Sequence, residues 1–213
     1  GHTLWDLYEW AHTPWEWHKD LFDYAKELGI TIFSSPFDPT AVDLLEDLNA
    51  PAYKVASFEA VDLPLIRYIA STGKPMIIST GMADGEEIPE ALDAAREGGC
   101  QQIALLHCVS GYPAPAADYN LRTIPDMAER FGTVVGLSDH TLDNTTAIAS
   151  VAIGASIIEK HFTIDRSGGG PDESFSLEPA ELAALCRDSK AVSAALWYVH
   201  YAAMSSDQGN VKF

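Results

Sequence analysis

Short apolar runs alternate along the chain with stretches whose apolar residues recur at helical spacing. The apolar runs predict strands at residues 30–35, 53–57, 75–80, 103–108, 133–138 and 156–162. These runs are hydrophobic almost throughout, which is typical of parallel strands buried on both faces. The stretches between them predict helices, among them one at 13–29 and a long one at 178–197. The pattern therefore predicts an α/β fold built from repeated strand–helix units.

The helix predicted at 13–29 has recognisable signals at both ends. Thr13 can cap its first turn, Pro14 takes the first helical position, and Glu16 completes a capping box. Gly29 follows the last periodic residue, where a left-handed backbone conformation ends many helices.

Six strand–helix units fit either an open doubly wound sheet or part of an eight-unit barrel. The glycine-rich phosphate fingerprint of dinucleotide folds does not follow the first strand. Polar residues instead follow every strand, and barrel active sites lie at the carboxyl ends of the strands. We therefore expect a (β/α)8 TIM barrel, with about six of its units in residues 1–198 and a linker at 199–213.

The formal net charge of −18 narrows the range of expected partners. It repels nucleic acid phosphates and anionic membrane surfaces, so neither is predicted as a partner. No apolar run approaches the roughly 20 residues of a membrane helix, and the sequence shows no signal-peptide pattern. Three widely spaced cysteines argue against a disulfide framework, so we expect a protein of the reducing cytoplasm.

Two histidines, His140 and His161, stand at the ends of the last two predicted strands. Adjacent strands lie about 4.8 Å apart, so imidazoles at matching heights could share one divalent cation. Ser138 has the same parity as His140, and Glu159 the same parity as His161, so each pair should face one side of its strand. The alternative is structural, with His140 capping the next helix and His161 packing beneath the barrel mouth.

Lys54 and Glu159 are charged residues within strands that are mostly apolar. Burial of Glu159 would be costly without a partner, which a metal-bound histidine, Lys54 or a purely structural ion pair would supply. Lys54 could bind phosphate or carboxylate as a point charge. Ser57, Ser79 and the backbone of Gly81 could complete such an anion site from neighbouring strand ends. Alternatively, Lys54 extends its ammonium group into solvent.

Two loops could form the walls of the same site. Residues 108–120 combine proline, glycine and aromatic residues, as in an ordered loop, and residues 166–179 form a long glycine-rich turn. Asp172 in the second loop could reach the hydroxyls of a polyol, or the loop could be only a connector.

Seven motifs occur in the order found in sialic acid synthases, namely SSPFD, YKVASFE, KPMIISTGM, CVSGYPAP, GLSDHT, EKHFT and GGPDESFSLEP. The chain resembles this N-acetylneuraminate synthase family over nearly its whole length. The stretches AHTPWEWHKDLF, ASFEAVDLPLI and GGPDESFSLEP look most like the pseudaminic acid synthase branch.

The resemblance implies condensation of phosphoenolpyruvate with an N-acylated amino sugar in its open aldehyde form. A divalent Mn²⁺ or Mg²⁺ ion would be held by His140 and His161, which together with Glu159 form the expected catalytic set. The residues implied to contact phosphoenolpyruvate are Lys54, Ser57, Ser79, Ser138 and Ser35. Those implied to contact the sugar are Glu59, Tyr112 and Asp172, and Ser110 looks like the residue of the pseudaminic branch.

The family pattern also includes parts that are not recognised in this sequence. They are two preceding strand–helix units, which carry a catalytic glutamate and a phosphate-binding lysine, and a C-terminal antifreeze-like domain. A homodimer is implied as well, and the chain by itself is predicted to lack synthase activity. The alternatives are a neuraminate or legionaminate synthase, an incomplete chain that only binds metal and phosphoenolpyruvate, and a phosphate-binding barrel isomerase.

Overall fold

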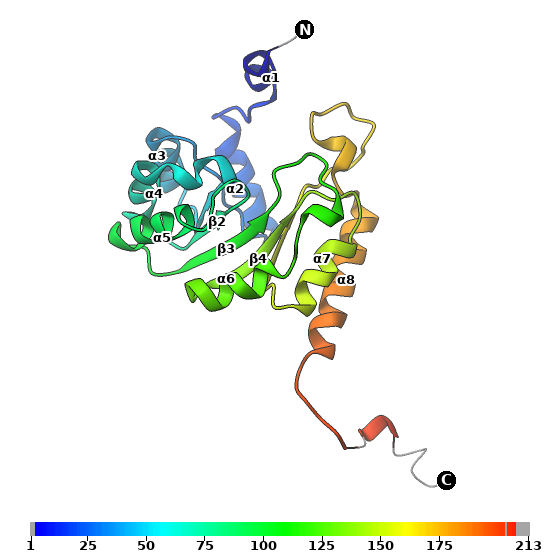
Figure 1. Cartoon of the computed structure of the whole chain (residues 1–213). Helices are drawn as coiled ribbons and strands as arrows, with labels where there is room; N and C mark the ends of the chain where they lie inside the picture. The colour runs from blue at the N-terminus through cyan, green and yellow to red at the C-terminus, as the bar shows by residue number, and fades with distance from the viewer. Residues whose placement is uncertain (1–2, 203, 208–213) are drawn as a thin grey trace.

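Five parallel strands form one curled sheet in the middle of the protein (Figure 1). A computed structural model describes residues 3–202 and 204–207. The strands are β1 (Tyr53–Val55), β2 (Met76–Ser79), β3 (Ile103–Cys108), β4 (Val134–Asp139) and β5 (Ile157–Lys160), and they lie side by side in chain order. The predicted α/β fold is confirmed, and the sheet forms part of a barrel wall. The number of units in a complete barrel stays a prediction.

Each pair of neighbouring strands is joined by a helical crossover, as parallel strands require. The crossover helices are α4 (Leu63–Ala70), α5 (Glu87–Glu97), α6 (Thr123–Phe131) and α7 (Thr145–Ala152), and α8 (Pro179–Ala195) follows β5. Three helices precede the sheet, namely α1 (Leu4–Ala11), α2 (Trp17–Leu28) and α3 (Pro39–Asp47). Short 3₁₀ turns are η1 (Ser57–Val61), η2 (Ala116–Asp118), η3 (Glu173–Phe175) and η4 (Ser205–Asp207).

The strand predicted at 30–35 is the one that does not form among the described residues. Its contact with the sheet is an isolated parallel bridge between Ser34 and Tyr53, where the N–H of Lys54 donates to the Ser34 carbonyl at 3.1 Å. Ile30 and Phe33 in this run are 60% and 38% exposed. Continuous hydrophobicity predicts a strand that is buried on both faces, whereas this run has exposed apolar side chains.

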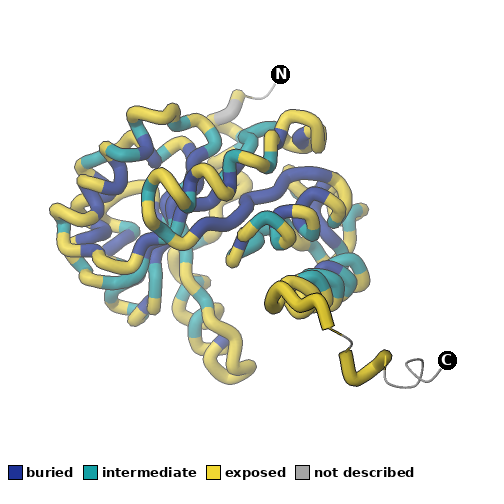
Figure 2. Tube along the Cα trace, turned by 60° about the horizontal axis from the view of Figure 1, so that its bottom comes forward, coloured by how far each residue is buried: buried dark blue, intermediate teal, exposed yellow. Residues whose placement is uncertain are grey.

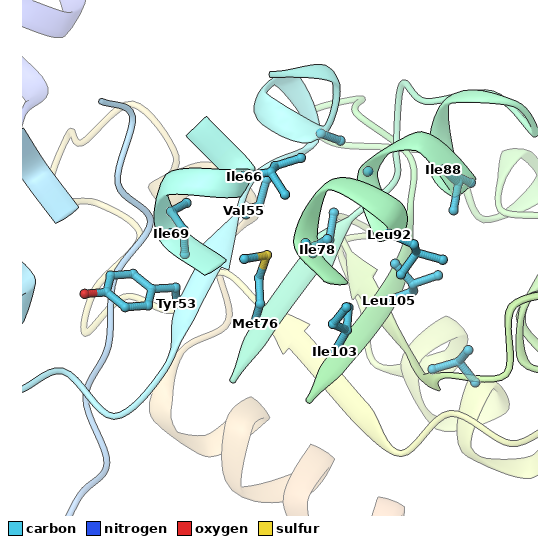
Figure 3. Packing of buried hydrophobic residues seen from close by; sticks show 14 of the residues in the cluster. Tyr53, Val55, Ile66, Ile69, Met76, Ile78, Ile88, Leu92, Ile103 and Leu105 are labelled. Carbon is cyan, nitrogen blue, oxygen red and sulfur yellow. The ribbon is translucent and has the colours of Figure 1, made fainter. Parts of the chain in front are cut away.

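The hydrophobic core lies between the sheet and the helices on its outer face. Figure 3 shows outward-facing residues of β1, β2 and β3 near residues of the helices α4 and α5, and all of them are buried. The strand residues are Tyr53, Val55, Met76, Ile78, Ile103 and Leu105, and the helix residues are Ile66, Ile69 and Leu92. Burial of one such side chain contributes about 1.5–3 kcal/mol to folding. The same band appears as the buried centre of the tube in Figure 2. This layer holds the strands in place and sets the position of their carboxyl ends.

Alternate residues of the same strands face the inside of the curl. At the carboxyl ends these residues are polar or small, namely Lys54, Ser79, Cys108, Ser138 and Glu159. The strand register pairs Cys108 with Ser138, and Ser138 with Glu159. Because the strands are parallel, these side chains gather at one edge of the sheet.

The helix α2 begins later than its sequence signals predict. Its first residue is Trp17, its N-cap is Glu16, and no side chain caps it. Thr13 and Pro14 precede it in a turn closed by the Trp17 N–H and the Pro14 carbonyl at 3.1 Å. The predicted capping box is therefore wrong, whereas Gly29 ends the helix with a φ of 69°, as expected.

After α8, residues 196–202 adopt no regular secondary structure. Residues 203 and 208–213 of the predicted linker lie outside the described residues, so the linker at 199–213 stays a prediction. Among the residues that the structure describes, no helix combines the length and apolar character needed to cross a membrane.

Candidate active site

An ion pair between a buried lysine and a partly exposed glutamate lies at the carboxyl ends of the strands, inside the curl of the sheet. Lys54 is 7% exposed, and its Nζ lies 3.6 Å from Oε2 of Glu159. The hydroxyl of Ser138 donates to Oε1 of the same carboxylate at 2.7 Å. Burial lowers the pKa of Lys54, and the nearby Glu159 carboxylate offsets only part of this effect. Lys54 is therefore paired and buried rather than extended into solvent.

Serine hydroxyls converge on Gly81, just after β2. The Oγ of Ser57 accepts the N–H of Gly81 at 3.1 Å. A methyl group on Gly81 would lie 2.6 Å from Oγ of Ser110 and 2.9 Å from Oγ of Ser57. The hydroxyl oxygens of Ser79 and Ser110 are buried and have no hydrogen-bond partner within the described structure. Buried hydroxyls without partners cost free energy, so a ligand that bonds to them would bind favourably.

The imidazoles of His140 and His161 lie next to each other, with ring centroids 5.3 Å apart. Nδ1 of His140 lies 2.8 Å from the carbonyl of Val109, which can only accept a hydrogen bond, so Nδ1 carries the proton in the neutral ring. Nδ1 of His161 lies 3.5 Å from a carboxylate oxygen of Asp172. Second-shell contacts of this kind orient histidines that bind metals through Nε2.

The two imidazoles have different electrostatic surroundings. Burial alone would lower the pKa of His140, but hydrogen bonds to Cys108 and to the Val109 carbonyl raise it. Burial lowers the pKa of His161, and the Asp172 carboxylate offsets part of that shift. A neutral imidazole, as His161 favours, is the form that binds a metal ion.

The donor set of this site fits a divalent ion that takes further ligands from water or substrate. Within residues 3–202 and 204–207, no group of three or more His, Cys, Asp or Glu side chains is arranged to hold a metal. His140 and His161 would supply two nitrogen donors, and water or substrate oxygens would supply the others. Oxygen ligands from water and substrate are the kind that Mn²⁺ and Mg²⁺ both prefer.

Aromatic rings close one side of the histidine pair. The ring of Tyr112 lies 4.3 Å from the ring of His140, and Phe175 lies 5.1 Å from His161, centroid to centroid. Tyr112 is 49% exposed and the side chain of Asp172 is 56% exposed, so both face the open side of the site. The two loops predicted as walls therefore both reach the histidines.

Glu59 and Ser35 are the two remaining predicted substrate residues. One carboxylate oxygen of Glu59, in η1, is buried without a partner among the described residues, and burial raises the pKa of this group. Ser35 is half-buried beside the bridge at Ser34, and in the described part of the chain its hydroxyl makes no hydrogen bond to the other predicted site residues. Thus Ser35 is the predicted residue that the structure does not tie to the cluster.

Three residues in or directly behind the site were not predicted to take part in it. The Sγ of Cys108 would lie 3.0 Å from a methyl group on Gly81, so the thiol belongs to the same cluster. The buried hydroxyl of Tyr119 accepts the N–H of His140 at 2.6 Å. Lys160 lies on the opposite face of β5 and pairs with Asp139. The inward parity of Cys108 was a usable signal, whereas the contact with Tyr119 joins distant segments and leaves no mark in the sequence.

The predicted cluster does not coincide with a hollow at the other end of the strands. A cavity of about 590 Å³ lies at the opposite, amino-terminal ends of the strands, lined by residues that include Gln102, Thr133 and Ile157. It lacks the charged pair and the imidazoles, so the chemistry of the carboxyl ends decides the location of the candidate site.

Comparison with known protein families identifies the chain. The model of the NeuB family matches residues 1–201. The chain belongs to the NeuB family. The resemblance seen in the seven motifs is thereby confirmed.

Curated relatives of the chain carry the names of several sugar acid synthases. A pseudaminic acid synthase of Helicobacter pylori is 47% identical over 182 residues, which cover 83% of this chain and 54% of the relative. An N,N'-diacetyllegionaminic acid synthase of Campylobacter jejuni is 42% identical over 196 residues, which cover 91% of this chain and 59% of the relative. The chain thus spans about half the length of the curated relatives it matches.

A solved structure of a sialic acid synthetase has the same fold. The crystal structure of an N-acetylneuraminic acid synthetase from Leptospira borgpetersenii, in complex with citrate, matches with a TM-score of 0.89 and 30% sequence identity. The match covers 97% of this chain and 72% of that chain. The family and its fold are therefore shown, and the identities of 47% and 42% do not separate a pseudaminic from a legionaminic product.

Proposed function

We propose that this protein is a nonulosonic acid synthase that condenses phosphoenolpyruvate with an open-chain N-acylated amino sugar and releases phosphate. The observation that carries the proposal is the juxtaposition of a buried ammonium, unpartnered serine hydroxyls and a pair of imidazoles at the strand ends of a NeuB-family chain. An anion site beside two metal-binding side chains is what this reaction requires.

Phosphoenolpyruvate is proposed to bind to the ammonium of Lys54 and to hydroxyls. Its phosphate and carboxylate would compensate a charge that burial disfavours, because the pKa of Lys54 is lowered in the ligand-free protein. The other proposed contacts are Ser35, Ser57, Ser79 and Ser138. The unpartnered hydroxyl of Ser79 supports this assignment.

The amino sugar is proposed to bind on the exposed side of the histidine pair. Tyr112 and Asp172 are half-exposed there, and carboxylates are good acceptors for sugar hydroxyls. Glu59 and Ser110 each have a buried oxygen without a partner among the described residues, so they can accept from or donate to polar groups of the sugar.

His140 and His161 are the residues that would hold the proposed Mn²⁺ or Mg²⁺ ion. When bound, such an ion supplies Lewis acidity that polarises the aldehyde oxygen of the sugar. Val109 and Asp172 keep the two rings oriented through their Nδ1 atoms. Glu159 holds the hydroxyl of Ser138 and the ammonium of Lys54 in place, which is the catalytic role proposed for it.

The bond changes of the proposed reaction balance with one water molecule. The enol carbon of phosphoenolpyruvate forms a C–C bond to the aldehyde carbon, and the aldehyde oxygen takes up a proton. Water adds to the cationic carbon that bears the phosphate, and phosphate leaves by C–O cleavage to give the keto acid. Residues that hold phosphoenolpyruvate against the aldehyde lower the barrier by fixing the two reacting carbons together.

Pseudaminic acid is the product proposed at the finer level, supported by the 47% identity to a pseudaminic acid synthase. Turnover measured side by side with the candidate hexosamines tests it, and a preference for the legionaminate or neuraminate precursor would contradict it.

A homodimer in the cytoplasm is also part of the proposal. Trp5 and Trp10 of α1 are 78% and 67% exposed, and all three cysteines are free, which support these two points.

Calorimetry with phosphoenolpyruvate, with and without Mn²⁺, tests the proposed function directly. We expect both ligands to bind, and we expect His140→Ala and His161→Ala to remove Mn²⁺ binding. Phosphate release is then measured with the chain and, where the gene encodes more, with the whole gene product. Binding without turnover in both would favour the alternative of a chain that only binds the two ligands, and binding of neither would refute the site.

A further inference from the structure

A second ion pair, between Asp139 and Lys160, lies directly behind the candidate active site. Nζ of Lys160 is 3.0 Å from Oδ2 of Asp139, and the two side chains are 4% and 0% exposed. The register of β4 and β5 places these residues opposite each other. They have the opposite parity to Ser138 and Glu159, so they face the helices rather than the inside of the curl. The proposed reaction does not use this pair.

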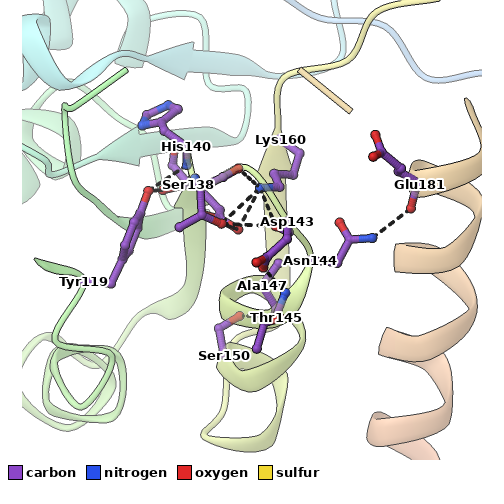
Figure 4. Close-up of polar contacts among 12 residues, drawn as sticks. Tyr119, Ser138, His140, Asp143, Asn144, Thr145, Ala147, Ser150, Lys160 and Glu181 are labelled. Carbon is purple, nitrogen blue, oxygen red and sulfur yellow. Dashed lines mark hydrogen bonds and ion pairs between the residues drawn. The ribbon is translucent and has the colours of Figure 1, made fainter. Parts of the chain in front are cut away.

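The ammonium of Lys160 is fully hydrogen-bonded within the loop that follows β4 (Figure 4). It donates to the carbonyl of Thr141 at 2.6 Å and to the carbonyl of Asp143 at 2.9 Å, in addition to its contact with Asp139. The carboxylate of Asp139 in turn accepts the N–H of Thr141 at 2.9 Å. One lysine therefore ties β5 to the whole turn between β4 and α7.

The position of this network along the chain links it to the two imidazoles. Asp139 directly precedes His140, and Lys160 directly precedes His161. The backbone on either side of the pair is fixed as well, since the N–H of His140 is bound by Tyr119 and the carbonyl of His161 accepts the N–H of Leu177 at 2.8 Å. The ion pair thus joins the two strand ends at the level where the imidazoles emerge.

Stability alone does not account for a pair in this place. The cost of removing both charges from water commonly matches or exceeds their attraction, and apolar residues of similar size often replace such pairs without loss. A fully satisfied polar network does, however, allow only one arrangement of the segments that it joins. Its use here is therefore the fixed geometry of the strand ends.

We propose that Asp139 and Lys160 are positioning residues, which set the separation and height of the His140 and His161 rings and thereby the affinity of the site for a divalent ion. This inference rests on the proposed function of the histidine pair. The two residues touch neither the proposed substrates nor the ion, and they act through the backbone that carries the imidazoles.

The test compares two double variants of the whole chain, each of which neutralises an ion pair with side chains of similar size. Asp139→Asn with Lys160→Met removes the pair behind the site. Glu46→Gln with Lys74→Met removes a half-buried pair of 2.6 Å remote from it and serves as the matched control. Mn²⁺ affinity is measured by calorimetry, unfolding by circular dichroism, and the ring geometry by NMR signals of the two imidazoles without metal.

We expect the Asp139/Lys160 variant to bind Mn²⁺ about tenfold or more weakly, as is common when groups that orient metal ligands are removed. Its imidazole signals should shift even without metal, whereas the control variant should keep both properties. Unchanged affinity and unchanged imidazole signals in the Asp139/Lys160 variant would overturn the inference.

Two other outcomes separate this inference from the proposed function. If the unmodified chain does not bind Mn²⁺, the metal part of the proposed function fails, and the metal-free imidazole signals alone decide the positioning role. If the double variant does not fold, Asp139→Asn alone is used, because its amide oxygen can still accept the N–H of Thr141. Unshifted imidazole signals in that variant would then overturn the inference.

Discussion

Replacing Lys54 by methionine should weaken phosphoenolpyruvate binding without destabilising the protein. The ammonium of Lys54 is 3.6 Å from Glu159 and 3.2 Å from the carbonyl of Val55, and the side chain is almost fully buried. At an effective dielectric constant of about 20, the attraction to Glu159 is about 4–5 kcal/mol. The desolvation penalty of a buried ion is also several kcal/mol. The lowered pKa of Lys54 indicates that the desolvation penalty is the larger of the two.

In Lys54→Met, leaving the Glu159 carboxylate without its lysine should cost little free energy. The side chain of Glu159 is 42% exposed and keeps its hydrogen bond from Ser138, so it is not an uncompensated buried charge. We therefore expect the free energy of unfolding to stay the same or to rise by up to about 2 kcal/mol, within the range seen when buried pairs are replaced by apolar residues.

The pH dependence of this difference has a definite sign. The pKa of Lys54 in the folded protein lies below its ordinary value of 10.5, so the charged form is penalised by folding at every pH below the folded pKa. This penalty shrinks as the pH rises through the folded pKa towards 10.5. The stability gained by Lys54→Met should therefore be largest near neutral pH and decrease as the pH rises.

In contrast to the stability, the affinity for phosphoenolpyruvate should decrease in Lys54→Met. A charge-assisted hydrogen bond contributes about 1.5–3 kcal/mol, which corresponds to about 10- to 150-fold weaker binding of phosphoenolpyruvate. Thermal unfolding with and without the ligand measures both quantities, and Lys74→Met is the control for loss of a lysine elsewhere. Lys54→Met that is less stable by more than about 2 kcal/mol and binds phosphoenolpyruvate normally would refute the reasoning.

Three further substitutions separate packing, charge and hydrogen bonding. Gly81→Ala should lower stability by about 1–3 kcal/mol through crowding and also abolish phosphoenolpyruvate binding. The control Gly98→Ala, in which the added methyl group also meets an atom at 2.6 Å, should lower only stability. Equal phosphoenolpyruvate binding by the two variants would contradict this. Burial would raise the pKa of Glu46, but hydrogen bonds from Lys74 and a tyrosine lower it below its ordinary value of 4.5. The ionised Glu46 carboxylate therefore stabilises the fold above pH 4.5, and this stabilisation is lost as the pH falls through the pKa of the folded state. Glu46→Gln should thus cost at most about 1 kcal/mol at pH 7 for this part-exposed pair, and denaturant unfolding should show no cost in strong acid. Tyr119→Phe leaves a buried backbone N–H unpaired, so calorimetric unfolding should show a loss of about 1–3 kcal/mol together with weaker Mn²⁺ binding; normal stability would count against this.

The periodic features of the molecule could be predicted from the sequence. Strand hydrophobicity located β1 to β5, and Lys54 was among the partners expected for Glu159, to which its ammonium lies at 3.6 Å. The run at 30–35 and the start of α2 could not be predicted in this way, because local propensity does not report which surfaces remain uncovered or which turn precedes a helix.

Contacts between distant segments explain the rest of what the sequence left open. Tyr119 binds the backbone of His140 from the loop that follows β3, and nothing in the spacing of these two residues predicts the contact. Lys160 and Asp139 were individually visible as charged residues at strand ends, but their pairing depends on the register between β4 and β5. Register is set by the packing of the whole sheet, so it becomes known only with the structure.

Two ion pairs involve the end of β5, one with Lys54 of β1 and one with Asp139 of β4, and they differ in a way that matches their proposed roles. The inner pair of Lys54 and Glu159 is long, at 3.6 Å, and its carboxylate is partly exposed. Neighbouring hydroxyls have no partner in the described structure. The outer pair of Asp139 and Lys160 is 3.0 Å long, buried, and closed by backbone carbonyls. Since an unsatisfied group gains most from a ligand and a satisfied one resists rearrangement, the inner pair is suited to bind an anion. The outer pair is suited to keep the imidazoles still while that anion binds and leaves.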